Sequence, residues 1–524
     1  MSKTSDLGSS AARSTFFLGI GLLFGNVISA LFMFIIARIL TPQGYGLYSV
    51  AGVPTSIAAI FRDWGIFTAA MHYIPYRRAK NEPYGGYVKA TIFFESMMGG
   101  SLFFSILLSA NHIAILLGKP EAASLIRISA VILFTGGILA AFQGIMLGIE
   151  KPEYIASLVV IFSIVRGSLS LLFLIFGLGV FGALLGQAIG WLLHALVALF
   201  ITLLRVPWHN DNTTLYLKEL LSYGIPYGLV AIASGLSIRL FNAIAASTLS
   251  FYDYGNYAAA NILFTALNGV AGSVISGITP SFSKFAALTE SINEASESFT
   301  TAVKFASIMI CGIAGLFIGV ANDLVDLFFG SAFVTTGVYV SMLTAILFLS
   351  AFGLYVISGV LLGFRKPKEV ARIGLIPLGF GLLFMIVTIE TLGVFSFIGA
   401  IIVTYIGRTA IGYLWVYKKY GFRISITSQL KILFSGLITL ILVKETALFM
   451  MRLSIFMLDG EILQLLVRIS VSGIIGIGMY FLLIVFLRVL SKKEIDYLNN
   501  MLSKIPIARI FSKSLIRVML KLAP

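Results

Sequence analysis

The 524-residue sequence contains few charged residues and almost no cysteine. Charged residues make up 11% of the chain, well below the roughly 25% of an average soluble domain, whereas hydrophobic residues make up 59%. The single cysteine, Cys311, lies inside an apolar run and cannot form a disulfide within the chain. This composition excludes an ordinary soluble protein and indicates an integral membrane protein.

Several signals of catalysis and of nucleic-acid binding are also missing. The sequence has no phosphate-binding loop of the form GxxxxGK[ST], so we expect neither ATP hydrolysis by this chain nor a cofactor. The longest predicted outer loop, 445–461, lacks a constellation of carboxylate and histidine residues for acid–base chemistry. The net charge of +15 does not indicate nucleic-acid binding, because the cations flank apolar segments instead of forming one patch.

Long apolar segments recur along the chain at the length that spans a bilayer. Divided at Gly, Pro and charge clusters, they predict an all-α membrane protein with about fourteen transmembrane helices: two six-helix bundles and two additional C-terminal helices. The N-terminal lobe occupies 14–204, the cytoplasmic linker 205–219, the C-terminal lobe 220–417, the two additional helices 431–490 and a basic amphipathic tail 491–524.

The distribution of Lys and Arg predicts the orientation, because cytoplasmic loops carry the excess of positive charge. With a cytoplasmic N-terminus, most loop cations fall on the cytoplasmic side, among them Arg77, Arg78, Lys366 and Lys368. The sequence therefore predicts a multi-pass protein of the cell (plasma or inner) membrane with both termini in the cytoplasm.

Phrases from the first half of the chain return in the second half in the same order. Tyr45-Gly46 in "TPQGYGLYSVA" matches Tyr254-Gly255 in "FYDYGNYAAAN", and "QGIMLGIEKPEYIA" at Gln143 matches "SGVLLGFRKPKEVA" at Ser358. Ordered matches of this kind indicate two homologous halves. Because six helices is an even number, both halves cross the membrane in the same sense. That parallel repeat is found in alternating-access transporters, with the substrate cleft expected between the halves.

The segments "ARILTPQGYGLYSVA", "RDWGIFTAAMHYI", "LLGKPEAASLIRISAVILF" and "GIEKPEYIAS" resemble the polysaccharide-biosynthesis flippase family of the multidrug/oligosaccharidyl-lipid/polysaccharide exporter superfamily. The resemblance covers about residues 14–417. It implies a V-shaped pair of six-helix bundles that moves a lipid-linked oligosaccharide, built on polyprenyl phosphate or pyrophosphate, from the cytoplasmic to the outer leaflet. It also implies the lipid bilayer and glycosyltransferases of the same pathway as partners. Two alternatives stay open: a cation-coupled multidrug exporter of the same superfamily, and a membrane polymerase or ligase of glycan assembly.

Four arginines fall inside predicted spans, where a charged side chain costs about 2.5–3.5 kcal/mol and therefore needs a reason. Arg166, Arg239 and Arg408 are predicted to bind substrate phosphates, because a guanidinium donates two parallel hydrogen bonds and stays charged. Alternatively, each pairs with an acid or with carbonyls inside its own lobe. Arg62 directly precedes Asp63, which favours a local ion pair or an interfacial anchor over substrate contact.

His194 and two acidic residues complete the candidates. His194 occupies the position of Arg408 in the repeat and is either a substrate contact or a histidine of the core. Asp63 and Glu95 are among the few acids inside predicted spans and are candidates for coupling transport to an ion, although Glu95 could equally lie at a lipid interface. The scarcity of acids disfavours an exporter of cations, and no metal site is predicted.

Overall fold

The computed structural model describes residues 2–206, 213–288, 292–364, 366–454, 460–491 and 494–495. Over these residues the chain is helical and contains no β-strand, so the predicted all-α class is confirmed. The predicted linker and the predicted tail lie partly outside the described residues, at 207–212 and at 492–493 and 496–524.

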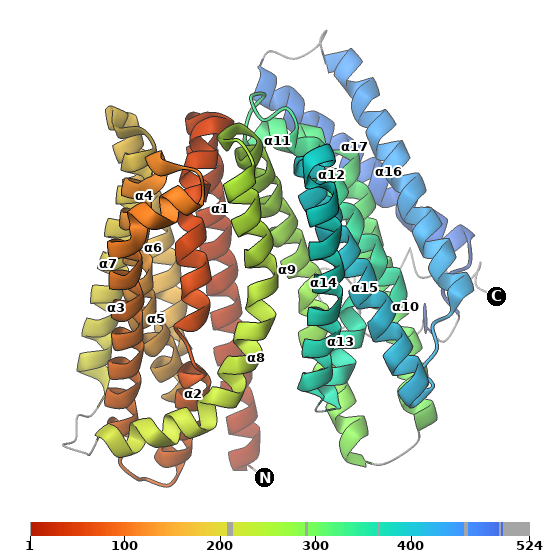
Figure 1. The fold of residues 1–524 in the computed structure, drawn as a ribbon. Helices are drawn as coiled ribbons and strands as arrows, with labels where there is room; N and C mark the ends of the chain where they lie inside the picture. The colour runs from red at the N-terminus through yellow and green to blue at the C-terminus, as the bar shows by residue number, and fades with distance from the viewer. Residues whose placement is uncertain are drawn as a thin grey trace. The chain divides into compact units, whose positions relative to one another are not determined.

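The helices form two compact units (Figure 1). The first unit comprises Met1–Ala259 with Leu392–Phe397, and the second comprises Ala260–Thr391 with Ile398–Pro524. This division falls within a helix and not at the predicted linker. The domain boundaries derived from the repeat therefore stay a prediction.

The first unit contains α1 (Ser2–Ala58), η1 (Ala59–Phe61), α2 (Ile66–Ala79), α3 (Gly85–Leu116), η2 (Pro120–Ala122), α4 (Ala123–Ser129), α5 (Val131–Gly148), α6 (Pro152–Phe173), the π-helical turn η3 (Leu174–Leu178), α7 (Gly179–Arg205), α8 (Thr213–Thr248) and the start of α9 (Phe251–Leu288). The second unit contains the rest of α9, α10 (Ile292–Gly319), α11 (Ala321–Phe328), α12 (Thr336–Ala345), η4 (Ile346–Phe352), α13 (Leu354–Gly363), α14 (Pro367–Leu392), α15 (Val394–Tyr420), α16 (Ile426–Ser454) and α17 (Glu461–Phe486).

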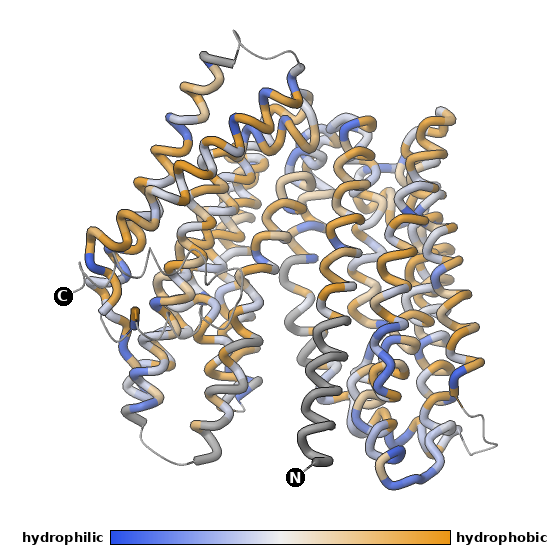
Figure 2. Tube along the Cα trace, turned by 180° about the vertical axis from the view of Figure 1, so that it is seen from behind, coloured by the Kyte–Doolittle hydropathy of each residue, from blue (hydrophilic) through white to orange (hydrophobic). Residues whose placement is uncertain are grey.

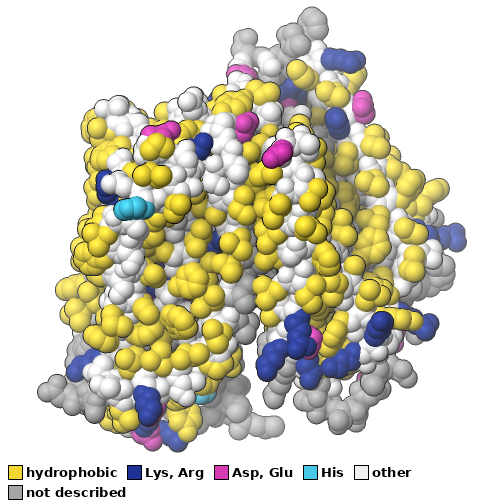
Figure 3. Space-filling model, in the orientation of Figure 1, with side chains coloured by type: hydrophobic (Ala, Val, Ile, Leu, Met, Phe, Trp, Pro, Cys, Tyr) yellow, Lys and Arg dark blue, Asp and Glu magenta, His cyan; other side chains and the backbone are white. Residues whose placement is uncertain are grey.

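The length and apolar surface of these helices make this a multi-pass membrane protein. Ten helical runs in the described residues are long and apolar enough to cross a bilayer, and one bent pair would make eleven. Hydrophobic residues predominate along the helices, and hydrophilic residues gather at their ends and turns (Figure 2). Leu108, Leu116 and Phe486 are at least 80% exposed, as side chains that face lipid are. In Figure 3 hydrophobic side chains cover the middle of the visible face, and many Lys and Arg lie toward its lower edge.

Two of these runs are much longer than a bilayer is thick. Leu18–Phe61 has 44 residues and Pro152–Arg205 has 54, against the roughly 20 residues of one span. The first run is interrupted at Thr41, where φ is 60°, and the second at Gly177 and Gly179, where φ is 82° and 55°. The sequence predicts two spans within each of these runs. The total of fourteen spans stays a prediction.

The apolar run that follows Tyr45 predicts one span over 45–73, and this prediction is wrong as a continuous helix. The structure ends η1 at Phe61 and begins α2 at Ile66. Gly65 has a left-handed backbone with φ of 82°, a conformation that favours glycine. The Asp63 carboxylate accepts a hydrogen bond of 3.3 Å from the Phe67 amide and so satisfies one free N–H of the first turn of α2. The helix therefore breaks at Arg62–Gly65, where two charged residues stand side by side.

The two copies of the Tyr-Gly phrase pack against each other within the first unit. A Cβ at Gly46 would collide with the Phe251 carbonyl oxygen, and a Cβ at Gly255 would collide with the Pro42 carbonyl oxygen. Pro42 precedes Gly46 by the same four residues by which Phe251 precedes Gly255. The contact is therefore reciprocal, and α1 and α9 approach backbone to backbone where the sequence repeats itself.

The two additional helices pack directly on the rest of the second unit. The Tyr480 hydroxyl on α17 donates a 2.7 Å hydrogen bond to the Ile308 carbonyl on α10, and its ring lies against Gly312. Beyond α17, Glu494 forms a 2.6 Å ion pair with Lys304 of α10. Helix α16 also packs on α10, because a Cβ at Gly315 would collide with the Gly436 carbonyl oxygen, so both helices belong to the second unit.

Candidate functional site

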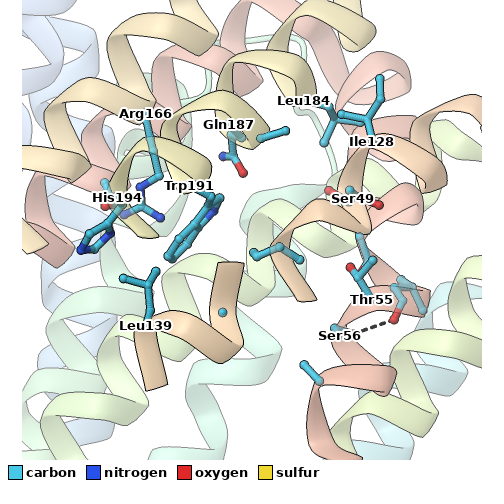
Figure 4. Close-up of a pocket in the computed structure, with 18 of the residues that line it drawn as sticks. Ser49, Thr55, Ser56, Ile128, Leu139, Arg166, Leu184, Gln187, Trp191 and His194 are labelled. Atoms are coloured by element: carbon cyan, nitrogen blue, oxygen red, sulfur yellow. Dashed lines mark hydrogen bonds between the residues drawn. The ribbon is translucent and has the colours of Figure 1, made fainter. Parts of the chain in front are cut away.

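A cavity of about 860 Å³ lies inside the first unit. It is lined by η1, α1 and α4 to α7, together with Asn242 of α8 and Tyr254 of α9. Figure 4 shows Arg166, Trp191 and His194 on one side and Thr55 and Ser56 on the other. Small polar side chains that reach the cavity include Ser29, Ser49, Thr55, Ser56, Gln187 and Asn242.

The charged groups that reach the cavity all carry positive charge. Arg62 and Arg166 line it, His194 is a third nitrogen base, and neither Asp nor Glu is found among its described lining residues. A concave site with low-dielectric walls and charge of one sign attracts ions of the opposite sign. The cavity is therefore suited to an anion.

Arg166 is held in place by uncharged groups. Its guanidinium carbon lies 3.9 Å from the centre of the Trp191 ring on α7, a cation–π contact. Its Nε donates to the Phe162 carbonyl at 3.0 Å. Gly190 permits this approach, because a Cβ there would collide with the Arg166 side chain. The described residues contain no carboxylate within ion-pair distance of Arg166, so its charge remains available to a ligand.

His194 lies between the core and the cavity. Its ring stacks on Phe162 at 4.6 Å and on Trp191 at 6.0 Å, and its exposure is 4%. Its Nδ1 has no hydrogen-bond partner in the described residues. Both sequence interpretations thus apply in part: the ring is packed as a core residue, and it also lines the cavity.

Arg62 also lines the cavity and lies in the break between η1 and α2. Its Nε is 3.8 Å from the Glu95 carboxylate of α3, so its ion pair is with Glu95. The adjacent Asp63 does not form an ion pair with it in the described residues. Gly136 and Gly137 of α5 make room for this arrangement, because a Cβ at Gly136 would collide with the Arg62 guanidinium and one at Gly137 with the Glu95 carbonyl.

Arg239 and Arg408 are placed differently. Arg239 lies on α8 of the first unit, does not line this cavity, and donates a 3.1 Å hydrogen bond to the Gly235 carbonyl one turn earlier. Arg408 lies on α15 of the second unit and donates a 3.1 Å hydrogen bond to the Ser358 hydroxyl. The structure thus brings Arg166, His194 and Arg62 around one cavity. The predicted phosphate-binding set of Arg166, Arg239 and Arg408 stays a prediction.

Sequence reasoning missed several residues of the site. Trp191 carries the Arg166 contact, yet the two residues lie on different helices and 25 positions apart in the sequence. Gln187 had a usable signal, because an amide inside an apolar span is uncommon. Gly136 and Gly137 had none, because their role depends on what packs against them.

Comparisons with known proteins agree with this architecture. A family described as polysaccharide biosynthesis protein matches residues 11–286. No curated protein matches the sequence. The structure resembles the lipid II flippase MurJ in an inward closed conformation, with a TM-score of 0.66, 15% identity and coverage of 90% of this chain and 98% of that one.

Two further solved structures share the fold. An inward-facing multidrug resistance MATE family transporter of the MOP superfamily gives a TM-score of 0.60 at 16% identity, covering 78% of this chain and 98% of that one. A MOP superfamily transporter from Pyrococcus furiosus, described as having a binding pocket of reversed polarity that suggests a different function, gives 0.52 at 19% identity, covering 78% and 96%. At these identities the likeness establishes the transporter fold alone.

Proposed function

This chain belongs to the family of polysaccharide biosynthesis proteins, and from that premise we propose that it is a flippase for an anionic lipid-linked oligosaccharide. Its substrate is a glycan on polyprenyl phosphate or pyrophosphate, which it moves from the cytoplasmic to the outer leaflet by alternating access. The observation that carries the proposal is the cavity lined by Arg62, Arg166 and His194, with no carboxylate among its described lining residues.

The chemistry of the cavity matches the head group of such a lipid. A guanidinium binds phosphate oxygens through two parallel N–H donors, and Arg166 is not neutralised by an acid. The hydroxyl and amide groups of Ser49, Thr55 and Gln187 suit sugar hydroxyls, which both donate and accept hydrogen bonds. The volume of about 860 Å³ lies within the roughly 300–1,000 Å³ of small-molecule sites. A cavity of this volume is large enough for the phosphates of the lipid and the sugars nearest to them.

The alternatives fit the cavity less well. A cation-coupled multidrug exporter needs carboxylates that face its substrate, whereas Glu95 is fully buried behind Arg62. A polymerase or ligase needs an acid–base pair around a reacting atom, and the cavity offers His194 without an acidic partner among its described lining residues. The fold therefore supports a transporter, and the charge of the cavity supports an anionic substrate.

The proposed orientation places both termini in the cytoplasm, with glycosyltransferases supplying the lipid-linked glycan on that side. The protein then works in the cell membrane between synthesis of the glycan and its use outside. Arg239 and Arg408 are proposed as further phosphate contacts at other stages of transport, and Glu95 with Asp63 as the ion-coupling groups.

Binding of a polyprenyl pyrophosphate sugar to the purified protein tests the proposal. Removal of the cavity charge in the triple variant Arg62→Ala, Arg166→Ala, His194→Ala is expected to weaken binding more than a hundredfold, because one charged hydrogen bond contributes about 1.5–3 kcal/mol. Arg127→Ala is the matched control, since Arg127 bonds to Asn111 and does not line the cavity. Unchanged binding by a folded triple variant would refute an anion site in this cavity.

A further inference from the structure

The carboxylate of Glu95 is completely buried, and few polar groups offset the cost of burying it. Its side chain has 0% exposure, and neither carboxylate oxygen accepts a hydrogen bond in the described residues. Burial of an ionised carboxylate costs several kcal/mol unless it is paired and hydrogen-bonded. The nearest cation is Arg62, whose Nε lies 3.8 Å away and is itself without a hydrogen bond in the described residues.

The same guanidinium reaches the cavity. Arg62 lines the cavity that binds the anion in the proposed function, and 21% of its side chain is exposed. Its position in the helix break leaves it outside the regular part of both η1 and α2. Arg62 therefore contacts both the buried Glu95 carboxylate and the cavity.

Little else can replace Arg62 beside Glu95. The other charged group that acts on Glu95 is the nearby Asp63 carboxylate, which disfavours a second negative charge there and can accept a hydrogen bond from Glu95 once Glu95 is protonated. Helix α5, which packs closely on α3, carries no titratable residue, and its Gly136 and Gly137 face the pair. Four charged side chains on other helices that pack on α3 bond elsewhere: Arg77 and Glu219 at Tyr87, Arg127 at Asn111 and Arg239 at Gly235.

We propose that Arg62 moves from Glu95 to the substrate anion, and that Glu95 takes up one proton as the guanidinium leaves. Before binding, the positive Arg62 balances the negative Glu95. After binding, Arg62 balances a phosphate oxygen, and Glu95 is a neutral acid whose proton comes from water. The proposal rests on the proposed function, because it requires an anion in the cavity. It assigns Glu95 as a proton-binding site that is coupled to substrate binding.

The coupling has a defined sign. Because anion binding favours protonation of Glu95, protonation of Glu95 must favour anion binding by the same factor. Affinity therefore falls as pH rises through the range in which Glu95 titrates. One linked proton limits the change to tenfold per pH unit.

Calorimetric binding of farnesyl pyrophosphate, a short polyprenyl pyrophosphate, tests this in the purified protein. Wild-type protein is expected to take up a proton from the buffer on binding, between zero and one per ligand, and to bind more weakly as pH rises. Glu95→Gln resembles the protonated acid, so it is expected to bind at least as tightly as wild type at every pH. The wild-type-to-variant ratio of Kd rises with pH. Titration of the ligand and of His194 is common to both proteins and cancels in this ratio.

Arg62→Gln is the second variant. It removes the shared cation, so binding is weaker and the uptake linked to Glu95 disappears. A constant ratio of Kd between wild type and Glu95→Gln, or a folded Glu95→Gln that binds more weakly, would overturn the proposal. Failure of the proposed function looks different, because wild-type protein would then bind farnesyl pyrophosphate no better than farnesol at any pH.

Discussion

The two units hold a deep arginine in different ways. In the first unit, Arg166 of α6 lies over the Trp191 ring, and His194 of α7 lies beside them. In the second unit, Arg408 of α15 occupies the repeat position of His194 and donates to the Ser358 hydroxyl. The arginines of the two units therefore do not occupy matching positions in the repeat. Each unit nevertheless contains a guanidinium that no carboxylate neutralises in the described residues.

A second difference concerns the helix that follows the Tyr-Gly phrase. In the first unit it breaks at Arg62–Gly65 and places Arg62 against Glu95, whereas α9 continues without a break through the corresponding positions. With the spacing of 212 residues between "LLGKPEAA" and "FFGSAFVT", Ser307 occupies the position of Glu95, and its hydroxyl donates to the Ser350 carbonyl. The Arg62–Glu95 pair and the helix break thus occur together in the first copy of the repeat. The matching positions of the second copy have neither the charges nor the break.

The close backbone contact at Gly46 and Gly255, which both copies of the Tyr-Gly phrase share, gives the largest expected effect. Gly46→Leu and Gly255→Leu should each destabilise the protein by about 3 kcal/mol or more, because backbone on the opposite helix cannot move aside. Gly269→Leu on α9 is the matched control, since a Cβ there meets nothing within 4 Å. Thermal unfolding in detergent measures all three. Harm from only one of the two test variants would show that the crossing is not reciprocal.

Single arginine variants would sharpen the comparison between the units. Arg166→Ala is expected to weaken binding of a polyprenyl pyrophosphate sugar about ten- to a hundredfold. Arg408→Ala should cost less, about three- to tenfold, because Arg408 is not among the residues that line the described cavity. Arg239→Ala should have the smallest effect of the three. Lysine at 166 should restore binding only partly, because it keeps the charge and loses the fork. A larger loss in Arg408→Ala than in Arg166→Ala would reverse the ranking of the two units.

The aromatic partners give the smallest effect. Trp191→Leu removes the cation–π contact to Arg166 and is expected to weaken binding about two- to fivefold, from about 0.5–1 kcal/mol. Tyr405→Leu is the counterpart in the second unit, where the described residues show no such contact with Arg408. It should change binding less than twofold. Equal losses in the two variants would mean that the aromatic residue acts through packing and not through the arginine.

The all-α membrane class could be predicted from the sequence, because recognising apolar runs of bilayer length needs no knowledge of contacts. The helix break at Arg62–Gly65 was missed although its signals were present. Asp63 and Gly65 favour a helix start and a left-handed turn, but the apolar residues on both sides made the segment look like one span.

The site was less predictable, because its contacts join residues far apart in the sequence. The partner of Arg62 was expected at its neighbour Asp63 and lies instead at Glu95, where two glycines of a third helix make room. Charge inside a span identified Arg166 and His194 as unusual. Which face of each helix they occupy is set by packing among α5, α6 and α7, which hydrophobicity does not encode when every face is apolar.

The reciprocal crossing of Gly46 and Gly255 also bears on the history of the gene. A contact in which each copy of a phrase touches the other in the same way is what two identical chains form around a two-fold axis. If the halves arose by duplication, a half-length ancestor could already have made this contact as a homodimer. Fusion of the two gene copies would then have joined, in one chain, two subunits that already formed this contact. Neither glycine could then be replaced by a larger residue, because the residue opposite is already glycine and cannot become smaller to make room.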